Sequence, residues 1–321
     1  MNIMKQVNST KNLRDFDSLF ELLDHFNTET KCIDYLAKLR WNNEVGCPYC
    51  SHDNCYVLNV KNRPKRWKCA KCRKQFSVTV GTIFEESKIS LKKWFVAIYL
   101  NSAHKKGISS YQLSRDIKVS QKSSWFMLQR IREIYKPDDN PFNSNEIELD
   151  DSWVGGKERN KHRLKRTPNT QGRSAKTKTP VLGIIERNGK VYAIPVTDTK
   201  ARTLMPIIKK KVNPGSKVFS DEWVSYRALG KDYDHQIVNH SANEYVRGEV
   251  HTNNIESFWA CLKRSLVGCY HHASDKHLER YVNEATFRFN NRKMTDGSRF
   301  DVALSNTNGR LDYKSLISNG D

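Results

Sequence analysis

Acidic residues are scarce in this sequence, and long hydrophobic runs are absent. The 321 residues include 35 Asp and Glu against 55 Lys and Arg, which gives a formal net charge of +20. Such an excess of positive charge indicates polyanionic partners rather than metabolites or acidic proteins.

No stretch of 18 apolar residues occurs, and residues 1–15 are polar with no hydrophobic signal core. We therefore expect a cytoplasmic protein with no membrane partner. Four of the eight cysteines (Cys32, Cys55, Cys261 and Cys269) are scattered. This pattern indicates a reducing compartment with one metal site rather than a disulfide framework.

The other four cysteines form two C-x2-C pairs, Cys47 with Cys50 and Cys69 with Cys72, separated by eighteen residues. At this spacing two knuckles can supply four thiolates to one tetrahedral Zn²⁺. The β-like segment around them is too small for a core of its own, so metal binding would contribute much of its folding free energy. Two pairs of buried thiols are the alternative.

Hydrophobic periodicity divides the chain into five segments. They are a helical lead-in at 1–42, a zinc ribbon at 43–86, a helix-turn-helix-like module at 87–136, an α/β unit at 146–292 and a loosely ordered tail at 293–321. In the α/β unit we expect strands at 146–154, 180–187, 190–196, 217–220 and 236–239, and helices at 201–211, 253–269 and 275–291. This alternation predicts a mixed α/β sheet with flanking helices.

The helix-turn-helix candidate begins with a short helix that turns Leu113 and Ile117 inward. After a tight turn, Ser120 can cap a second helix. Polar residues of its first turn, Lys122 and Ser123, would then reach base edges in the major groove. An ordinary helical hairpin is the alternative.

Asp150, Asp221 and Glu256 are three carboxylates that could converge, and such a set can hold two divalent cations. Strand alternation places Glu146, Glu148 and Asp150 on one polar face and Asp151 among packing residues, which favours Asp150 over Asp151 as the ligand.

Asp221 and Glu256 also have structural explanations. Asp221 could cap a helix, and Glu256 could belong to a capping box that starts at Asn253. The apolar stripe of the helix leaves Glu256 and Lys263 on another face, with Arg264 beside Lys263. These two cations could receive a phosphate.

Residues 157–178 contain nine Lys or Arg and one Glu between two expected strands. We interpret this segment as a flexible hairpin arm that grips DNA. The expected DNA contacts are Arg159, Lys161, Arg163, Lys165 and Arg166.

Residues 148–157, 220–226 and 251–264 resemble the three blocks of DDE insertion-sequence transposases with an amino-terminal zinc ribbon, and residues 279–292 resemble their closing helix. The resemblance implies an RNase H-like, DD34E-type catalytic domain in which Asp150, Asp221 and Glu256 bind two Mg²⁺ or Mn²⁺ ions. Asn254 is an alternative last ligand, and His251 a possible neighbour.

The resemblance also implies an activity. A homo-oligomer near the nucleoid would bind the terminal inverted repeats of an insertion sequence and target double-stranded DNA, and would cleave and join strands. A non-enzymatic DNA-binding regulator and a structure-specific nuclease of the same fold are the alternatives.

Overall fold

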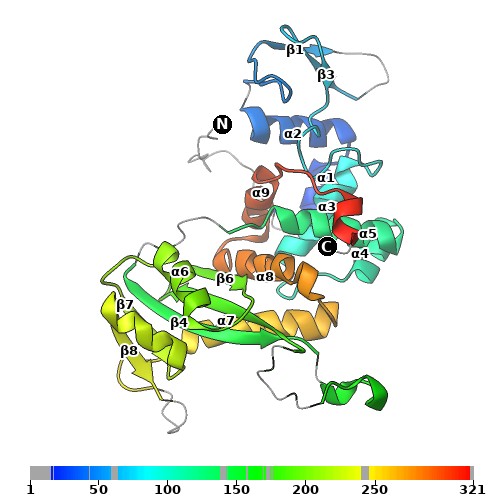
Figure 1. The fold of residues 1–321 in the computed structure, drawn as a ribbon. Coiled ribbons are helices and arrows are strands. Elements are labelled where there is room, and N and C mark those ends of the chain that lie inside the picture. The colour runs from blue at the N-terminus through cyan, green and yellow to red at the C-terminus, as the bar shows by residue number, and fades with distance from the viewer. Residues whose placement is uncertain are drawn as a thin grey trace. The chain divides into compact units, whose positions relative to one another are not determined.

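The computed structural model describes residues 16, 18–42, 44–58, 64–137, 142, 144–156, 158–168, 170, 174, 176–239 and 246–318. It divides into two compact units (Figure 1). We call Met1–Ile134 with Lys293–Asp321 the helical unit, and Tyr135–Arg292 the sheet unit. Within the described residues, no helix is long and apolar enough to cross a membrane.

The helical unit contains a small antiparallel sheet in the order β1-β2-β3, with helices before and after it in the chain. Its elements are α1 (Leu19–His25), α2 (Glu29–Trp41), β1 (Cys55–Leu58), β2 (Arg66–Cys69), β3 (Gln75–Phe76), α3 (Leu91–Ala103), α4 (Ser110–Ile117), α5 (Gln121–Glu133), α9 (Asp296–Ser305) and α10 (Tyr313–Ile317).

The residues after Lys293 complete the core of the helical unit. Phe300 of α9 is fully buried, and its ring centroid lies 5.6 Å from that of Phe95 and 6.1 Å from that of Phe26. The backbone N–H of Ile83 donates to the carbonyl of Thr307. The expectation of a loosely ordered tail at 293–321 is therefore wrong for its described residues, which form two helices.

The sheet unit contains a five-stranded mixed sheet in the order β6-β5-β4-β7-β8. Strands β4, β5 and β6 are antiparallel, and β7 and β8 run parallel to β4. The elements are β4 (Glu146–Val154), η1 (Glu158–Asn160), η2 (Arg163–Lys165), β5 (Thr179–Glu186), β6 (Val191–Pro195), α6 (Ala201–Lys211), β7 (Lys217–Asp221), η3 (Val224–Lys231), β8 (Asp234–Val238), α7 (Asn253–Ser265), η5 (Leu266–Tyr270) and α8 (Asp275–Asn290). This arrangement confirms the expected RNase H-like mixed sheet with flanking helices.

Each face of this sheet buries its own apolar cluster. One cluster joins β4 and β5 to α7 and α8 and includes Ile255, Phe258 and Trp259. The other joins the opposite face to α6 and η3 and includes Ile147 and Leu149. Alternate residues of β4 therefore face different helices, so strand parity decides which helix each β4 carboxylate meets.

Candidate functional site

The four paired cysteines converge in the small sheet of the helical unit. Their sulfur atoms all lie within 4.8 Å of one another. Cys47 Sγ is 3.7 Å from Cys72 Sγ, and Cys50 Sγ is 3.6 Å from Cys69 Sγ. Tetrahedral zinc with Zn–S bonds of about 2.3 Å requires S···S distances of about 3.8 Å. The donor set therefore fits one Zn²⁺.

Matching turns shape the two knuckles. The N–H of Ser51 donates to the carbonyl of Cys47, and that of Arg73 to the carbonyl of Cys69. Ser51 and Arg73 both adopt positive φ, at 55° and 60°. Burial opposes ionisation of the Cys69 thiol, but the backbone N–H groups of Cys72 and Lys71 donate to it and lower its pKa to about 6. A thiolate is the form that binds zinc.

Asp150 lies midway along β4, and Asp221 is the last residue of the adjacent parallel strand β7. The β4–β7 register pairs Glu148 with Phe219. Carried forward by two residues, it sets Asp150 beside Asp221, and both side chains then lie on the face that α7 covers. The structure thus brings these two carboxylates together.

Asp150 is tied to α7 by a tryptophan. The indole N–H of Trp259 donates to Asp150 Oδ2 at 3.0 Å, and the N–H of Asp151 donates to Asp150 Oδ1 at 2.8 Å. Burial, followed by the charges of Asp221 and Asp151, raises the pKa of Asp150 to about 7. A half-buried carboxylate with acidic neighbours is a favourable environment for a cation.

Asp151 faces the other way. Its Oδ2 accepts a hydrogen bond of 3.0 Å from the indole of Trp153, two residues along the same strand. The opposite placement of Asp150 and Asp151 agrees with strand parity. The polar face predicted for Glu146, Glu148 and Asp150 is nevertheless largely covered by α7, which leaves Glu148 fully buried and the other two partly exposed.

Asp221 and Glu256 both take part in local capping. Asp221 Oδ1 accepts from the N–H of Trp223, just before η3, at 3.1 Å. The N-cap of α7 is Thr252 rather than Asn253, and the Thr252 hydroxyl donates to Glu256 Oε1 at 3.2 Å.

Glu256 itself is exposed, one helical turn before Trp259. Among the described residues, the cysteine quartet is the one set of three or more His, Cys, Asp or Glu whose ligand atoms lie within 4.8 Å of one another. The carboxylate oxygens of Asp150, Asp221 and Glu256 therefore do not all lie within 4.8 Å of one another.

Sequence reasoning missed Glu148. Its carboxylate accepts from the backbone N–H groups of Asn254 and Ile255 at 3.0 and 3.1 Å, and from the Asn254 amide at 2.8 Å. His251 Nδ1 lies 3.3 Å away without the alignment of a hydrogen bond. Strand parity places Glu148 on the same face as Asp150, but no local pattern indicates partners more than 100 residues away.

The helix-turn-helix candidate is present as α4 and α5. Leu113 and Ile117 are buried, as expected. Ser123 is part of the helix cap, since its N–H and its hydroxyl both bond the Ser120 hydroxyl. Lys122 is exposed, with Nζ 5.2 Å from the ring centroid of Tyr313 in α10.

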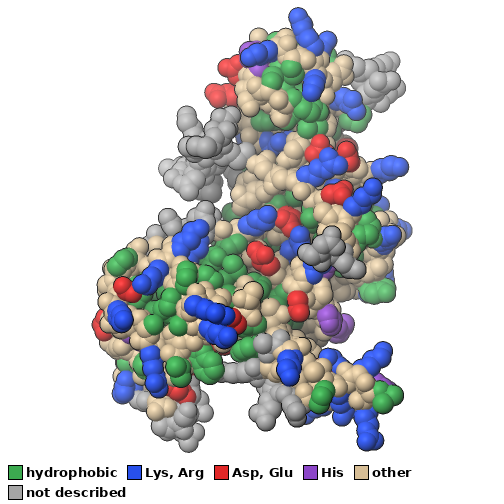
Figure 2. Space-filling view, in the orientation of Figure 1, with side chains coloured by type: hydrophobic (Ala, Val, Ile, Leu, Met, Phe, Trp, Pro, Cys, Tyr) green, Lys and Arg blue, Asp and Glu red, His purple; other side chains and the backbone are tan. Residues whose placement is uncertain are grey.

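The arm between β4 and β5 carries exposed cations (Figure 2), and its described part contains η1 and η2. Glu158 pairs with Lys161, and its second oxygen accepts from the N–H of Thr167. The Arg166 guanidinium donates to the carbonyls of Arg159 and Lys161. Two of the five expected DNA contacts, Lys161 and Arg166, therefore also hold the arm in shape.

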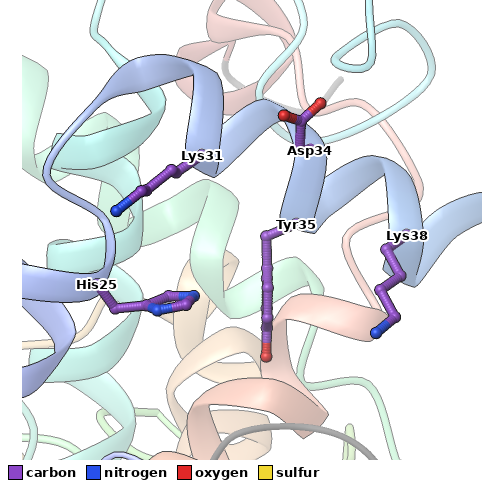
Figure 3. Close-up of a pocket in the computed structure, with 5 residues that line it drawn as sticks. All are labelled: His25, Lys31, Asp34, Tyr35 and Lys38. Atoms are coloured by element: carbon purple, nitrogen blue, oxygen red, sulfur yellow. The ribbon is translucent and has the colours of Figure 1, made fainter.

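A hollow of about 290 Å³ lies along α1 and α2, lined by His25, Lys31, Asp34, Tyr35 and Lys38 (Figure 3). Burial, followed by the charge of Asp301, raises the pKa of Tyr35, whose hydroxyl donates to Asp301 Oδ1. None of the predicted site residues lines this hollow.

Two protein-family models match separate parts of the chain. The transposase zinc-ribbon domain family matches residues 27–75, and the ISXO2-like transposase domain family matches residues 143–290. A Halobacterium salinarum protein named "Uncharacterized protein in transposable element ISH50" is 29% identical over 273 residues, which is 82% of this chain and 91% of that protein.

Two further matches are partial. An "Uncharacterized transposase-like protein" of Haemophilus influenzae is 36% identical over 103 residues, which is 32% of this chain and 82% of that protein. Among solved structures, the crystal structure of the Mos1 strand transfer complex matches 59% of this chain and 73% of its own, with 12% identity and a TM-score of 0.20.

The sheet unit and the cysteine quartet, together with these sequence matches, define the class as a transposase with a zinc ribbon. Within that class, the chain belongs to the ISXO2-like transposase family.

Removing one thiolate should release the zinc. We expect Cys69→Ser to lose most of its bound zinc, because three thiolates and a hydroxyl that stays protonated bind Zn²⁺ far more weakly. Zinc per chain is measured by elemental analysis after gel filtration. Cys261→Ser, which changes an exposed cysteine on α7, is the control and should keep the wild-type zinc content. Equal zinc in both variants would contradict the assignment.

Asp150→Asn should stabilise the protein without added Mg²⁺ at pH 8, and the gain should vanish toward pH 4. The raised pKa means that the folded state keeps a proton which the unfolded state releases near pH 4. The protonated Asp150 side chain therefore favours the folded state fully below pH 4. As pH rises through about 7 this contribution is lost, and the free energy of unfolding of the wild type falls by about 2 to 4 kcal/mol. Asn has no proton to lose.

Thermal unfolding of zinc-loaded protein between pH 4 and 8 measures this effect. Asp198→Asn is the control, and its change in stability at pH 8 should have the opposite sign to that of Asp150→Asn. Bonds from the Thr203 hydroxyl and the Lys200 N–H lower the pKa of Asp198, so its loss should destabilise the protein at pH 8. A stability difference between Asp150→Asn and wild type that does not vary with pH would exclude a raised pKa for Asp150.

Proposed function

We propose that this transposase binds the ends of an insertion sequence and catalyses DNA cleavage and strand transfer in an acidic site formed by Asp150, Asp221 and Glu256. The observation that carries the proposal is the proximity of Asp150, midway along β4, to Asp221, the last residue of the parallel strand β7, in a chain of net charge +20. Clustered carboxylates can bind metal ions, and a basic surface can bind the phosphate backbone of DNA, so their combination suits metal-dependent chemistry on DNA.

Each residue of the proposed acidic site has a distinct role. Asp221, which is buried, and Asp150, which is half-buried, would supply the negative charge, and Trp259 holds Asp150 in one orientation. Glu256, one turn before Trp259, would approach them as the third ligand. Mg²⁺ or Mn²⁺ held there would supply Lewis-acid stabilisation of the phosphoryl oxygens.

The reaction is an in-line displacement at phosphorus. Water attacks a terminal phosphodiester in cleavage, and the freed 3′-hydroxyl attacks a target phosphodiester in transfer. In each step one P–O bond forms and one breaks. Lys263 and Arg264, exposed on α7, would receive the phosphate.

Neutralising each carboxylate tests the proposal. We expect Asp150→Asn, Asp221→Asn and Glu256→Gln each to lower Mg²⁺-dependent nicking of terminal DNA by at least about 100-fold, because the charge that holds the cation is lost. Glu279→Gln, at an exposed glutamate of α8, is the matched control and should nick normally. A variant of the three that nicks at the wild-type rate removes that residue from the site, and Asn254→Ala then tests the alternative last ligand.

Scoring nicking and strand transfer separately distinguishes the other candidates. A regulator binds DNA but does not cut it in Mg²⁺. A nuclease of the same fold cuts without joining.

The arm supports DNA binding in this proposal. Arg163 and Lys165 are exposed in η2, and Glu158 and Arg166 brace the arm from within. An arm with this internal bracing presents its cations together.

We expect the double change Arg163→Ala with Lys165→Ala to weaken DNA binding. It should also reduce the slope of log K against log salt by about 1.8, the value for two lost phosphate contacts. Arg202→Ala with Lys210→Ala removes the same charge from exposed positions on α6 and is the control. Fluorescence anisotropy over a salt series measures both. Equal slopes in the two double variants would exclude the arm as a phosphate-binding element.

A further inference from the structure

Glu148 caps a helix that lies far from it in the sequence. Its side chain is fully buried, and it accepts the backbone N–H groups of Asn254 and Ile255 together with the Asn254 amide. Thr252, the N-cap of α7, makes no side-chain bond to the helix backbone. A carboxylate at a helix amino terminus is favoured both by the free N–H groups and by the helix dipole. The strand therefore supplies the cap that the helix lacks.

Arg187 completes the attachment. Its Nε donates to Glu148 Oε1 at 3.2 Å, and its Nη2 donates to the carbonyls of Glu249 and His251 at 2.6 and 3.1 Å. The guanidinium carbon lies 3.6 Å from the ring centroid of Phe219 in β7. One arginine thus joins the Glu148 carboxylate to the segment that leads into α7.

We infer that Glu148 is the positioning residue of the acidic site. It fixes the start of α7 against β4, so that Glu256 on the helix is set relative to Asp150 on the strand. This inference rests on the proposed function, because it concerns the carboxylates assigned there.

Glu148 can affect the positions of both Asp150 and Glu256 because its contacts lie close to each of them in the chain. It precedes Asp150 by two residues on the same strand face, a spacing of about 7 Å along the strand. One of its acceptor bonds is to Ile255, the residue before Glu256. The bond from Trp259 to Asp150 is a second attachment one turn further along α7. Two attachments on one helix fix both the rotation of α7 about its axis and its position along β4. Catalysis is sensitive to a misplacement of about 1 Å.

Stability alone does not account for this arrangement. A buried ion pair is often no more stabilising than apolar residues of the same volume. The sheet unit holds a second fully buried carboxylate, Glu284, which pairs with Arg288 one turn away on the same helix. That pair lies within α8 and does not join β4 to α7. It therefore serves as an internal control for the loss of a buried ion-paired carboxylate.

The test compares Glu148→Gln with Glu284→Gln in the zinc-loaded full chain, at a temperature where circular dichroism shows both folded. Every neighbour of Glu148 named above is a donor, so the glutamine NH₂ group must face at least one of them. We expect Glu148→Gln to raise the Mn²⁺ concentration for half-saturation about 10- to 100-fold, measured by electron paramagnetic resonance, and to lower Mg²⁺-dependent nicking over the same range. Glu284→Gln should leave both unchanged.

Hydrogen exchange supplies a readout that does not depend on activity. Peptides covering the first turn of α7 should exchange faster in Glu148→Gln than in wild type, while peptides covering β7 should not. Arg187→Gln is the second variant, for use if Glu148→Gln does not fold, because Arg187 is partly exposed. It should change Mn²⁺ binding and α7 exchange in the same direction.

The outcomes separate the two proposals. Wild type that neither binds Mn²⁺ nor nicks DNA overturns the proposed function and this inference with it. Active wild type, with Glu148→Gln and Arg187→Gln that bind Mn²⁺ and nick normally, overturns only the positioning role. Equal losses in Glu148→Gln and Glu284→Gln would also overturn it, because they would reflect a general loss of stability.

Discussion

The close approach of α7 to the sheet is the constraint on which the sheet unit depends. It is possible because Gly183 on β5 has no side chain. A Cβ there would lie 2.5 Å from Trp259 Cζ2 and 2.8 Å from Ile255 Cδ1, distances that side-chain carbons do not tolerate. The absence of one methyl group therefore lets the Trp259 indole approach β5 closely while its N–H donates to Asp150. It also lets the amino terminus of α7 reach Glu148.

The same helix creates two different acidic environments on one strand face. Glu148 is surrounded by donors, so its charge is satisfied within the chain. Asp150 receives two N–H bonds but also has Asp221 and Asp151 as neighbours, so its charge is only partly satisfied. Burying a charge is costly unless partners compensate. The satisfied carboxylate is suited to a structural task, and the partly satisfied one to holding a cation.

Much of this arrangement could be predicted from sequence. The sequence pattern predicted both ends of Glu146–Val154 and Ala201–Lys211, because each segment is one uninterrupted regular element. Cysteine spacing predicted the quartet, since two C-x2-C turns have few ways to fold around four thiolates. The opposite directions of Asp150 and Asp151 followed from strand geometry alone.

The errors have a common physical cause. Alternation assigns a residue to a side of a strand but does not reveal what covers that side, so the buried Glu148 was placed on a polar face. The helices after Lys293 are short, and their stability comes from contacts such as Phe300 on Phe95, residues distant in sequence. In both cases a tertiary partner decided the outcome. The DNA contact of Ser123 stays a prediction, and its hydroxyl also takes part in the local cap.

The helical unit is assembled from both ends of the chain, with the sheet unit inserted between Ile134 and Lys293. During synthesis the sheet unit can therefore complete its contacts while the helical unit still waits for α9. Phe300, which packs beside Phe26 and Phe95, is made only after every residue of the sheet unit. The sheet unit could then fold before the helical unit, although most of the helical unit is made first. Until α9 is made, the aromatic core around Phe26 and Phe95 would lack the Phe300 ring.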